Sequence, residues 1–282
     1  SSLDPEIAKI AFVFVLIGYG TKIGLAPMHT WLPDAHGKAP VPVSALLSGV
    51  LLNVALFTLL RFKVVTDASA DPSFTAGLLI SFGVFSIVIS ALIMLNATNY
   101  KRLIAYSSVE NMGVLLIGFG FGGIGVFAST LHLMYNALIK SSLFMMAGII
   151  FLKYSSTKIA KVYGALKVLP VTSILFFVAF LAITGLPPFG VFMTKMLILS
   201  SAITAYPYLT SIALLFMTLL FVGFLKHVAA MVFGKKPDDI PVGEVSVWLI
   251  APPMVLLFLA LILSFYLPPI LSSLVNAVVL HY

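Results

Sequence analysis

Residues 20–42 read GTKIGLAPMHTWLPDAHGKAPVP and place a charged residue, Lys22, at the end of a strongly apolar stretch. The preceding residues, IAKIAFVFVLIGYG, predict a helix in hydrocarbon. Gly24 and Pro27 then interrupt its hydrogen bonds, because proline lacks an N–H group and glycine favours a helix end. An uncompensated charge at bilayer depth costs roughly 3 kcal/mol, and freed backbone groups are tolerated only where they face protein or water. The stretch therefore indicates a broken membrane helix beside a hydrated, proton-accessible interior.

The composition is that of a polytopic membrane protein. Hydrophobic residues make up 61% of the chain and charged residues 9%, with a mean hydropathy of +1.16, whereas soluble domains have about 25% charged residues. In such a protein, the lysines and arginines behind the formal net charge of +7 indicate which loops are cytoplasmic. No nucleic-acid partner is expected. The chain has no cysteine, no nucleotide-binding loop and no metal-ligand spacing. We therefore expect no catalytic residue, cofactor or metal in this chain, and any redox chemistry takes place on a partner.

The apolar segments predict about eight spans in an all-α fold, since each span needs roughly 20 apolar residues. The predicted spans are the broken helix from Ile7 to the WLPDAH segment and residues 44–60, 75–95, 103–121, 125–152, 170–205, 209–233 and 247–267. The segment 170–205 is too long for one straight span and contains TGLPPFG. Its Gly185, Pro187 and Pro188 predict a second broken helix.

The basic residues outside the predicted spans are distributed unequally between the two sides of the membrane. One side carries Lys38, Lys101, Arg102, Lys153, Lys158, Lys161, Lys167, Lys235 and Lys236; the other carries Lys9, Arg61 and Lys63. Because cytoplasmic loops are enriched in lysine and arginine, the first side should be cytoplasmic. The N-terminus is then external, and the chain is a multi-pass protein of the cell membrane, plasma or inner.

Four further lysines lie inside the predicted spans: Lys22, Lys140, Lys195 and Lys226. Lys226, beside His227, is close to a span end, where a lysine can extend to the headgroups, so both interpretations stay open for it. Lys22 and Lys195 instead flank the two helix breaks. Two interrupted spans in one chain are typical of a transport site at mid-membrane, which favours a functional role for both lysines.

Lys140 lies in the middle of a predicted span with two other polar residues on its helix face. His132, Asn136 and Lys140 recur at a spacing of four, which places them on one side of a helix. Such a stripe could simply hold helices together, although an amide alone would do that. A histidine and a lysine can also change protonation, because burial disfavours the charged form of a lysine. The stripe therefore favours a proton relay.

Glu110 is the one carboxylate in a predicted span. It could be an interfacial partner of Lys101 or Arg102, or it could form the mouth of a proton path from the cytoplasm. His29 and His36 frame the WLPDA sequence near the predicted far interface. Two histidines without converging carboxylates are a poor metal site, so we treat them as supporting polar groups.

Four motifs together resemble one family of membrane subunits. KIGLAPMHTWLPDAHGKAP, KRLIAYSSVENMG, HLMYNALIKSSLF and TGLPPFGVFMTK are similar to the antiporter-like proton-translocating subunits shared by respiratory complex I, multisubunit sodium/proton antiporters and group 4 membrane-bound hydrogenases. The chain looks closest to the hydrogenase-4 and formate hydrogenlyase type. The resemblance implies the C-terminal part of a fold of about fourteen helices with two inverted repeats. Residues 1–62 would end the first repeat, 73–235 would form the second, and 246–282 would be a C-terminal helix and interfacial tail.

The resemblance also implies roles for particular residues. Lys22 matches the broken-helix lysine of the first repeat; His132 and Lys140 match a relay histidine and the central lysine of the second; Lys195 matches the terminal residue on its broken helix. Asn53 and Asn136 stand where many relatives have a lysine and a histidine, and they can hydrogen-bond to water but carry no charge. The chain begins at what would be the seventh family helix, which indicates a partial chain or a shortened relative.

The implied function is translocation of protons, or of sodium in exchange for protons, by a non-redox subunit of a redox-driven complex. Its partners would be other antiporter-like and small membrane subunits, the lipid bilayer, and a redox arm with iron–sulfur clusters and a nickel–iron or related catalytic subunit. One alternative is a multisubunit cation/proton antiporter without a redox partner. A second is a passive membrane scaffold, against which the buried lysines argue. Whether the chain counts as part of an enzyme stays open.

Overall fold

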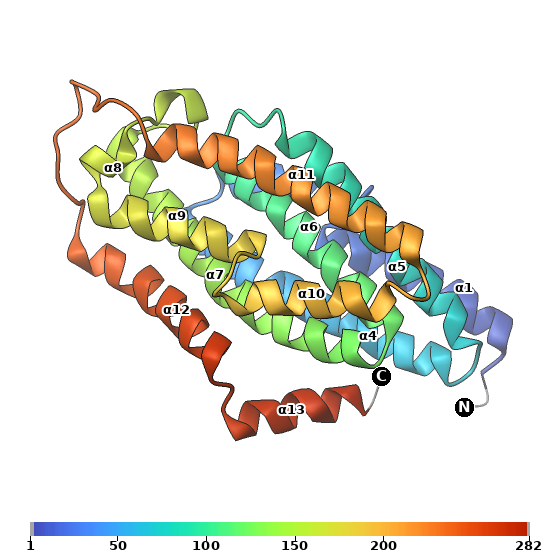
Figure 1. Ribbon diagram of the computed structural model, residues 1–282. Helices are drawn as coiled ribbons and strands as arrows, with labels where there is room; N and C mark the ends of the chain where they lie inside the picture. Colours follow the sequence, from blue (N-terminus) through green and yellow to red (C-terminus); the bar gives the residue numbers. More distant parts are fainter. Residues whose placement is uncertain (1–2, 281–282) are drawn as a thin grey trace.

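The described part of the chain is a bundle of helices that run side by side (Figure 1). The structure, a computed structural model, describes residues 3–280. The helical elements are α1 (Pro5–Ile23), α2 (Trp31–Lys38), α3 (Val41–Leu46), η1 (Leu47–Leu51), α4 (Leu52–Asp67), α5 (Pro72–Met94), α6 (Tyr100–Phe121), α7 (Ile124–Tyr154), η2 (Ile159–Lys161), α8 (Ala165–Val168), α9 (Pro170–Thr184), α10 (Gly190–Ala202), α11 (Pro207–Val232), α12 (Val247–Phe265) and α13 (Pro269–Val279).

The prediction of about eight spans, two of them discontinuous, is confirmed. Within residues 3–280, six helical stretches are long and apolar enough to cross a membrane: the continuous stretch from α3 through η1 to α4, and helices α5, α6, α7, α11 and α12. Helix α1 is not one of these six because it carries several charged side chains, and α9 and α10 are each too short to cross the membrane alone. The broken pairs α1/α2 and α9/α10 complete the eight.

The first break follows α1. Gly24 ends this helix in the left-handed conformation, with φ of 82°, and the next N–H donates to the C=O five residues earlier at 2.8 Å. A helix end of this kind favours glycine, because a Cβ atom would strain the backbone. Pro27 lies in the following turn. The indole N–H of Trp31 donates to the freed C=O of Thr21 at 2.6 Å, so the break is satisfied by protein.

The second break, between α9 and α10, repeats this geometry. Gly185 has φ of 92°, and the N–H of Leu186 donates to the C=O of Leu181 at 3.0 Å. Pro187 and Pro188 then separate the two half-helices. Both half-helices therefore end in the same capping motif, as the two glycine–proline segments of the sequence predict.

The second span is longer than predicted, which corrects the placement of Lys63. It runs over Val41–Asp67 rather than residues 44–60, so Lys63 lies within α4 and not in an external loop. Its side chain is buried and pairs with Asp67 at 2.5 Å, and the Thr75 hydroxyl donates to the other carboxylate oxygen. The carboxylate of Asp67, one turn away, compensates the charge of Lys63, so this lysine can be buried in the last turns of the helix. Counting loop charges alone does not reveal this pairing.

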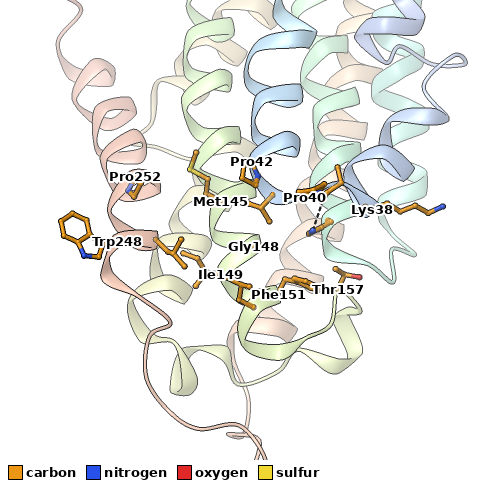
Figure 2. Close-up of a pocket in the computed structure, with 16 residues that line it drawn as sticks. Lys38, Pro40, Pro42, Met145, Gly148, Ile149, Phe151, Thr157, Trp248 and Pro252 are labelled. Carbon is orange, nitrogen blue, oxygen red and sulfur yellow. Dashed lines mark hydrogen bonds between the residues drawn. The ribbon is translucent and has the colours of Figure 1, made fainter.

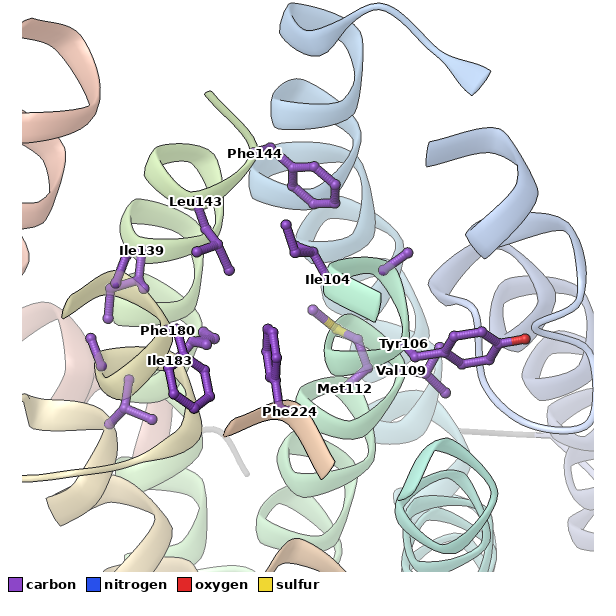
Figure 3. Packing of buried hydrophobic residues seen from close by; sticks show 14 of the residues in the cluster. Ile104, Tyr106, Val109, Met112, Ile139, Leu143, Phe144, Phe180, Ile183 and Phe224 are labelled. Carbon is purple, nitrogen blue, oxygen red and sulfur yellow. The ribbon is translucent and has the colours of Figure 1, made fainter. Parts of the chain in front are cut away.

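Helix α6 lies at the centre of the bundle, between α5 and α7, and almost every one of its residues is buried. Figure 3 shows the apolar core beside it, where Met112 of α6, Leu143 of α7, Phe180 of α9 and Phe224 of α11 meet. The Phe180 and Phe224 rings have centroids 4.7 Å apart. This packing leaves the polar residues of α6 with only protein groups around them.

Helix α12 is held against α7 by two hydrogen bonds. The Tyr135 hydroxyl donates to the C=O of Leu263 at 2.8 Å, and the Ser142 hydroxyl donates to the C=O of Pro253 at 2.7 Å. Figure 1 shows α12 along one edge of the bundle and α13 set at an angle beyond it.

The close approach of α5 and α6 depends on glycine. A methyl group at Gly83 would lie 2.7 Å from the Gly113 carbonyl oxygen, whereas a methyl group at Gly77 on the same helix would meet no atom within 4 Å. Gly83→Ala should therefore destabilise the subunit by about 1–3 kcal/mol, as overpacked cores do, while Gly77→Ala should be neutral or slightly stabilising. Thermal unfolding of the detergent-solubilised complex measures the difference. Equal midpoints for the two variants would contradict the α5–α6 contact.

Candidate functional site

Three polar residues of α6 lie within little more than one helical turn in the middle of the bundle. Ser107, Glu110 and Asn111 are all at most 1% exposed. Beyond the first turn of this helix most of the other residues are apolar, and polar groups buried in hydrocarbon are costly unless they find partners. The partners come from α7 and α10, and together these residues form the candidate site.

Lys195 of α10 forms a buried ion pair with Glu110. Its Nζ lies 2.8 Å from Glu110 Oε1, and the two side chains are 4% and 1% exposed. The same Nζ lies 3.5 and 3.4 Å from the carbonyl oxygens of Ile183 and Thr184, the last residues of α9. The C-terminal end of a helix attracts positive charge, so the broken helix itself helps to hold the lysine.

This ion pair excludes one of the two interpretations of Glu110, while its part in a proton path stays a prediction. The carboxylate does not pair with Lys101 or Arg102; Arg102 instead lies 3.3 Å from Asp34. The interfacial alternative is therefore wrong, because Glu110 lies about two turns inside α6, within reach of α10. Its second oxygen, Oε2, is buried without a protein partner.

His132 of α7 bridges α10 and α6. Its Nδ1 lies 2.8 Å from the Thr194 hydroxyl, and its Nε2 lies 2.9 Å from Oδ1 of Asn111. The Asn111 amide group donates to the C=O of Ser107 at 2.6 Å, so Oδ1 faces the ring and Nε2 carries a hydrogen. Nδ1 then accepts from Thr194 when the ring is neutral and donates to it when the ring is protonated.

Thr194 can accommodate both states of His132. Its hydroxyl lies 3.0 Å from the C=O of Val191, which can accept the hydroxyl hydrogen whenever Nδ1 is itself a donor. A histidine can therefore gain or lose a proton here without leaving a buried donor or acceptor unsatisfied.

Lys140, near the middle of α7, is fully buried and has a similar environment. Its Nζ donates to the C=O of Ile104 at 2.9 Å and contacts the Ser107 hydroxyl. Ser107 also lies 2.8 Å from the Ile104 carbonyl. The hydroxyl can thus donate to a neutral amine or, when the amine is protonated, accept from it and donate to Ile104. Among the described residues, no carboxylate is within ion-pair distance of Lys140.

These contacts bring side chains of α6, α7 and α10 into one buried row, in which Asn111 bonds to the backbone C=O of Ser107 and Lys140 to the Ser107 hydroxyl. The series runs from Lys140 through Ser107 and Asn111 to His132 and Thr194, which directly precedes Lys195; we call it the central polar chain. The sequence predicted Lys140, Lys195 and His132 as site residues. It did not single out Ser107, Asn111 or Thr194. The run SSVEN within an apolar span is the signal that could have identified Ser107 and Asn111.

Asn136, predicted on the same face as His132 and Lys140, is fully buried, and neither its amide nitrogen nor its oxygen has a protein partner. Asn53 is half-buried and is the second residue of α4, which follows the π-helical turn Leu47–Leu51. Its amide donates to the Gly49 C=O at 2.9 Å, while its oxygen is unpartnered. Both asparagines therefore place buried, unpartnered polar atoms in the bundle without adding a charge.

The two histidines that frame WLPDA, His29 and His36, are buried inside the bundle. His36 has no exposed surface, stacks on Phe144 of α7 at 4.7 Å between ring centroids, and has no partner for either ring nitrogen. His29 packs edge-on against Tyr106, with Nδ1 unpartnered. The helix break folds α2 back onto α6, and this brings both rings inward.

Two of the lysines predicted inside spans lie on the outer surface of the described chain. Lys22 is exposed and lines a shallow groove with Tyr19 and other residues of α1, because α1 packs on α4 through its opposite face. Lys226 is also exposed, and neighbouring His227 donates from Nε2 to the Leu95 C=O at 3.2 Å. Within the described residues, Lys22 therefore does not share the buried environment of Lys140 and Lys195.

A membrane bundle with two broken helices and ionisable side chains joined at its centre defines an antiporter-like membrane subunit. The chain belongs to the NADH:quinone oxidoreductase/Mrp antiporter transmembrane family, whose profile matches residues 4–221. The resemblance predicted from the sequence motifs is thus confirmed.

Relatives within this family include proteins of different complexes. The chain is 40% identical over 270 residues to the hydrogenase-4 component F homolog of Methylacidiphilum infernorum, covering 95% of this chain and 56% of the relative. It is 34% identical over 235 residues to NAD(P)H-quinone oxidoreductase chain 4 of Prochlorococcus marinus, covering 80% of this chain and 44% of that protein. The chain therefore spans about half the length of these relatives.

Solved structures share the fold. A chain of the membrane-bound sulfane sulfur reductase, an archaeal respiratory complex, superposes with a TM-score of 0.87 at 26% identity, covering 99% of this chain and 57% of that chain. A chain of the Mrp complex from Dietzia sp. gives a TM-score of 0.86 at 20% identity, covering 96% and 58% respectively, which is a likeness of fold alone.

The Glu110–Lys195 pair makes a prediction about stability. Removing one partner leaves a buried charge uncompensated, so Glu110→Gln and Lys195→Met should each destabilise the subunit by about 3–5 kcal/mol. The double variant Glu110→Gln/Lys195→Met should lose much less than the sum, because no buried charge remains. Thermal dissociation of the subunit from the solubilised complex provides the measurement. Additive losses in the double variant would show that the two side chains do not compensate each other.

Proposed function

We propose that this chain moves protons across the membrane, or sodium in exchange for protons, with the central polar chain as its proton path. The observation that carries the proposal is a buried row of polar side chains between Lys140 and the Glu110–Lys195 pair, hydrogen-bonded in two segments: Lys140 with the Ser107 hydroxyl, and Asn111 with His132 and Thr194. The Asn111 amide donates to the backbone C=O of Ser107, and Thr194 is the sequence neighbour of Lys195, so protons would cross these two steps through water. Protons move along such series when each member can exist in two protonation or hydrogen-bonding states. Lys140 and His132 can, because an adjacent hydroxyl adjusts to either state.

Electrostatic coupling supplies the driving step in this proposal. In a low-dielectric interior, moving the charge of one lysine changes the stability of charge on its neighbours over several ångströms. The Glu110–Lys195 pair holds Lys195 at the end of α9. If the pair opens so that the Lys195 ammonium moves toward Lys140, repulsion between the two positive charges would favour loss of a proton from Lys140. Buried polar atoms without protein partners, on Glu110, Asn136 and His36, mark positions where water can extend the path.

The two-repeat organisation remains part of the proposal. The matching helix ends at Gly24 and Gly185 support an equivalence between the two broken helices. Residues 1–62 would then close one repeat and 73–235 would form the next, with the central polar chain inside the second. Lys22 would contribute to the first repeat and lies outside this path.

We propose a redox-driven complex as the setting, with antiporter-like and small membrane subunits and a redox arm as partners. The hydrogenase-4 component F homolog and the sulfane sulfur reductase chain, both similar over almost the whole of this chain, support that assignment. A multisubunit cation/proton antiporter is the second candidate, favoured by the likeness in fold to the Mrp complex. Copurification of iron–sulfur or nickel–iron subunits distinguishes the two. A passive scaffold is disfavoured by Lys140, whose burial without a carboxylate gives a scaffold no advantage.

Lys140 provides the principal test. Lys140→Met keeps the apolar stem and should assemble normally, but proton uptake per electron in vesicles containing the whole complex should fall at least about tenfold, because a thioether cannot exchange a proton. Lys140→Arg should also fail, since guanidinium stays protonated. The matched control is Lys167→Met, which should pump normally. Lys167 is exposed at the end of the bundle that carries Lys101, Lys153, Lys158 and Lys161, which we call the basic end. Normal pumping by Lys140→Met would refute the proposed path.

We further propose that the basic end of the bundle is cytoplasmic and the N-terminus external. Ser155 follows α7 at that end, whereas Ala68 follows α4 at the other. Ser2, at the N-terminus, lies outside the described residues. Because the chain lacks cysteine, Ser155→Cys and Ala68→Cys each introduce a single thiol in this subunit. An impermeant thiol reagent should label only Ala68→Cys in intact cells; labelling of Ser155→Cys instead would reverse the orientation.

A further inference from the structure

A cavity of about 730 Å³ lies at the basic end of the bundle, away from the central polar chain (Figure 2). The link between α2 and α3, the last turns of α7 and the first turns of α12 surround it. Most of its wall is apolar and includes Met145, Ile149, Leu249 and Pro252. This volume is within the range of sites that bind small molecules. The cavity therefore can hold an extended apolar group.

Two lysines, Lys38 and Lys101, are among the residues that line this apolar cavity, and Lys101 is the buried one. Lys101, in the first turn of α6, is only 5% exposed. Its Nζ makes one long hydrogen bond, 3.4 Å to the Ala39 C=O, and lies 5.1 Å from the centroid of the Phe151 ring. Among the described residues, no carboxylate lies within ion-pair distance of it, so most of its hydrogen-bonding capacity is unused. Figure 2 shows the neighbouring Lys38 side chain directed away from the cavity.

The position of Lys101 increases the demand for a negative partner. The N-terminal turn of a helix is electropositive and disfavours a cation, so the α6 dipole and the ammonium act in the same direction. A buried ammonium is normally paired or well hydrogen-bonded, since its desolvation is costly. Thr157, whose hydroxyl accepts from the Asn99 amide at 2.8 Å, also lines the cavity and has its own hydrogen available. The site thus offers two donors to an anion.

We propose that this cavity binds an anionic phospholipid, with the phosphate against Lys101 and the acyl chains along the α7 and α12 wall. The apolar wall excludes a small hydrophilic anion as the preferred ligand, and the ammonium excludes a purely apolar one. Trp248, 86% exposed at the start of α12, lies at the rim of the cavity, and tryptophan is enriched at the headgroup level of membranes. The excess of basic residues at this end of the bundle favours an anionic over a zwitterionic headgroup.

Photocrosslinking in the assembled complex tests this site. The complex is reconstituted into nanodiscs that contain a phosphatidylglycerol analogue with a diazirine in its acyl chain, or the matched phosphatidylcholine analogue. After irradiation, mass spectrometry compares crosslinks on the α7 and α12 peptides around Ile149 and Leu249 with those on the lipid-exposed α11 peptide around Leu215, which normalises for bulk lipid. We expect the phosphatidylglycerol probe to be enriched at the cavity peptides.

The variants assign that enrichment to Lys101. Lys101→Gln should reduce it about tenfold, as expected for loss of one charge-assisted hydrogen bond, while Lys101→Arg should retain it. The matched control Lys167→Gln removes an exposed lysine at the same end of the bundle and should leave it unchanged. Equal crosslinking by both lipids, an unaffected Lys101→Gln, or no crosslinks at the cavity because a protein segment fills it would each overturn the proposal. The readout needs no turnover, so it is independent of proton transfer.

Discussion

The cost of placing a charged group in a low-dielectric interior governs how this structure is built. Lys195 is held by a carboxylate and by the end of a broken helix, whereas Lys140 has only a carbonyl and a hydroxyl. Two lysines of one site are therefore stabilised very differently. The first can remain charged inside the bundle, while the charge on the second depends on what surrounds it at a given moment. That difference is what a proton path needs at its centre.

The two helix breaks have the same backbone geometry, but different groups donate hydrogen bonds to their freed carbonyls. At the first, the indole of Trp31 donates to Thr21. At the second, the ammonium of Lys195 approaches the carbonyls of Ile183 and Thr184. The donor at the first break is neutral, so that contact does not depend on nearby charges. The donor at the second break is charged, so the strength of that contact changes with the charges around it.

Hydroxyl groups next to ionisable residues are the less obvious part of the site. Thr194 beside His132 and Ser107 beside Lys140 each have a backbone carbonyl three residues earlier as a second acceptor. A buried polar group that can satisfy only one protonation state would fix its neighbour in that state. A hydroxyl with two acceptors lets its neighbour take either state, which is why we include these small residues in the proposed path.

Composition and local chain chemistry were sufficient for much of this protein. The apolar runs gave the spans, and glycine with proline gave both breaks, because these properties depend on neighbours in sequence. The spacing of His132 and Lys140 placed them on one helix face for the same reason. Tertiary packing decided the rest: which face of α1 is covered, and hence that Lys22 is exposed, and that Glu110 reaches Lys195 across 85 positions of sequence. Such pairings arise from how helices pack, and a single helix carries no information about the partner opposite it.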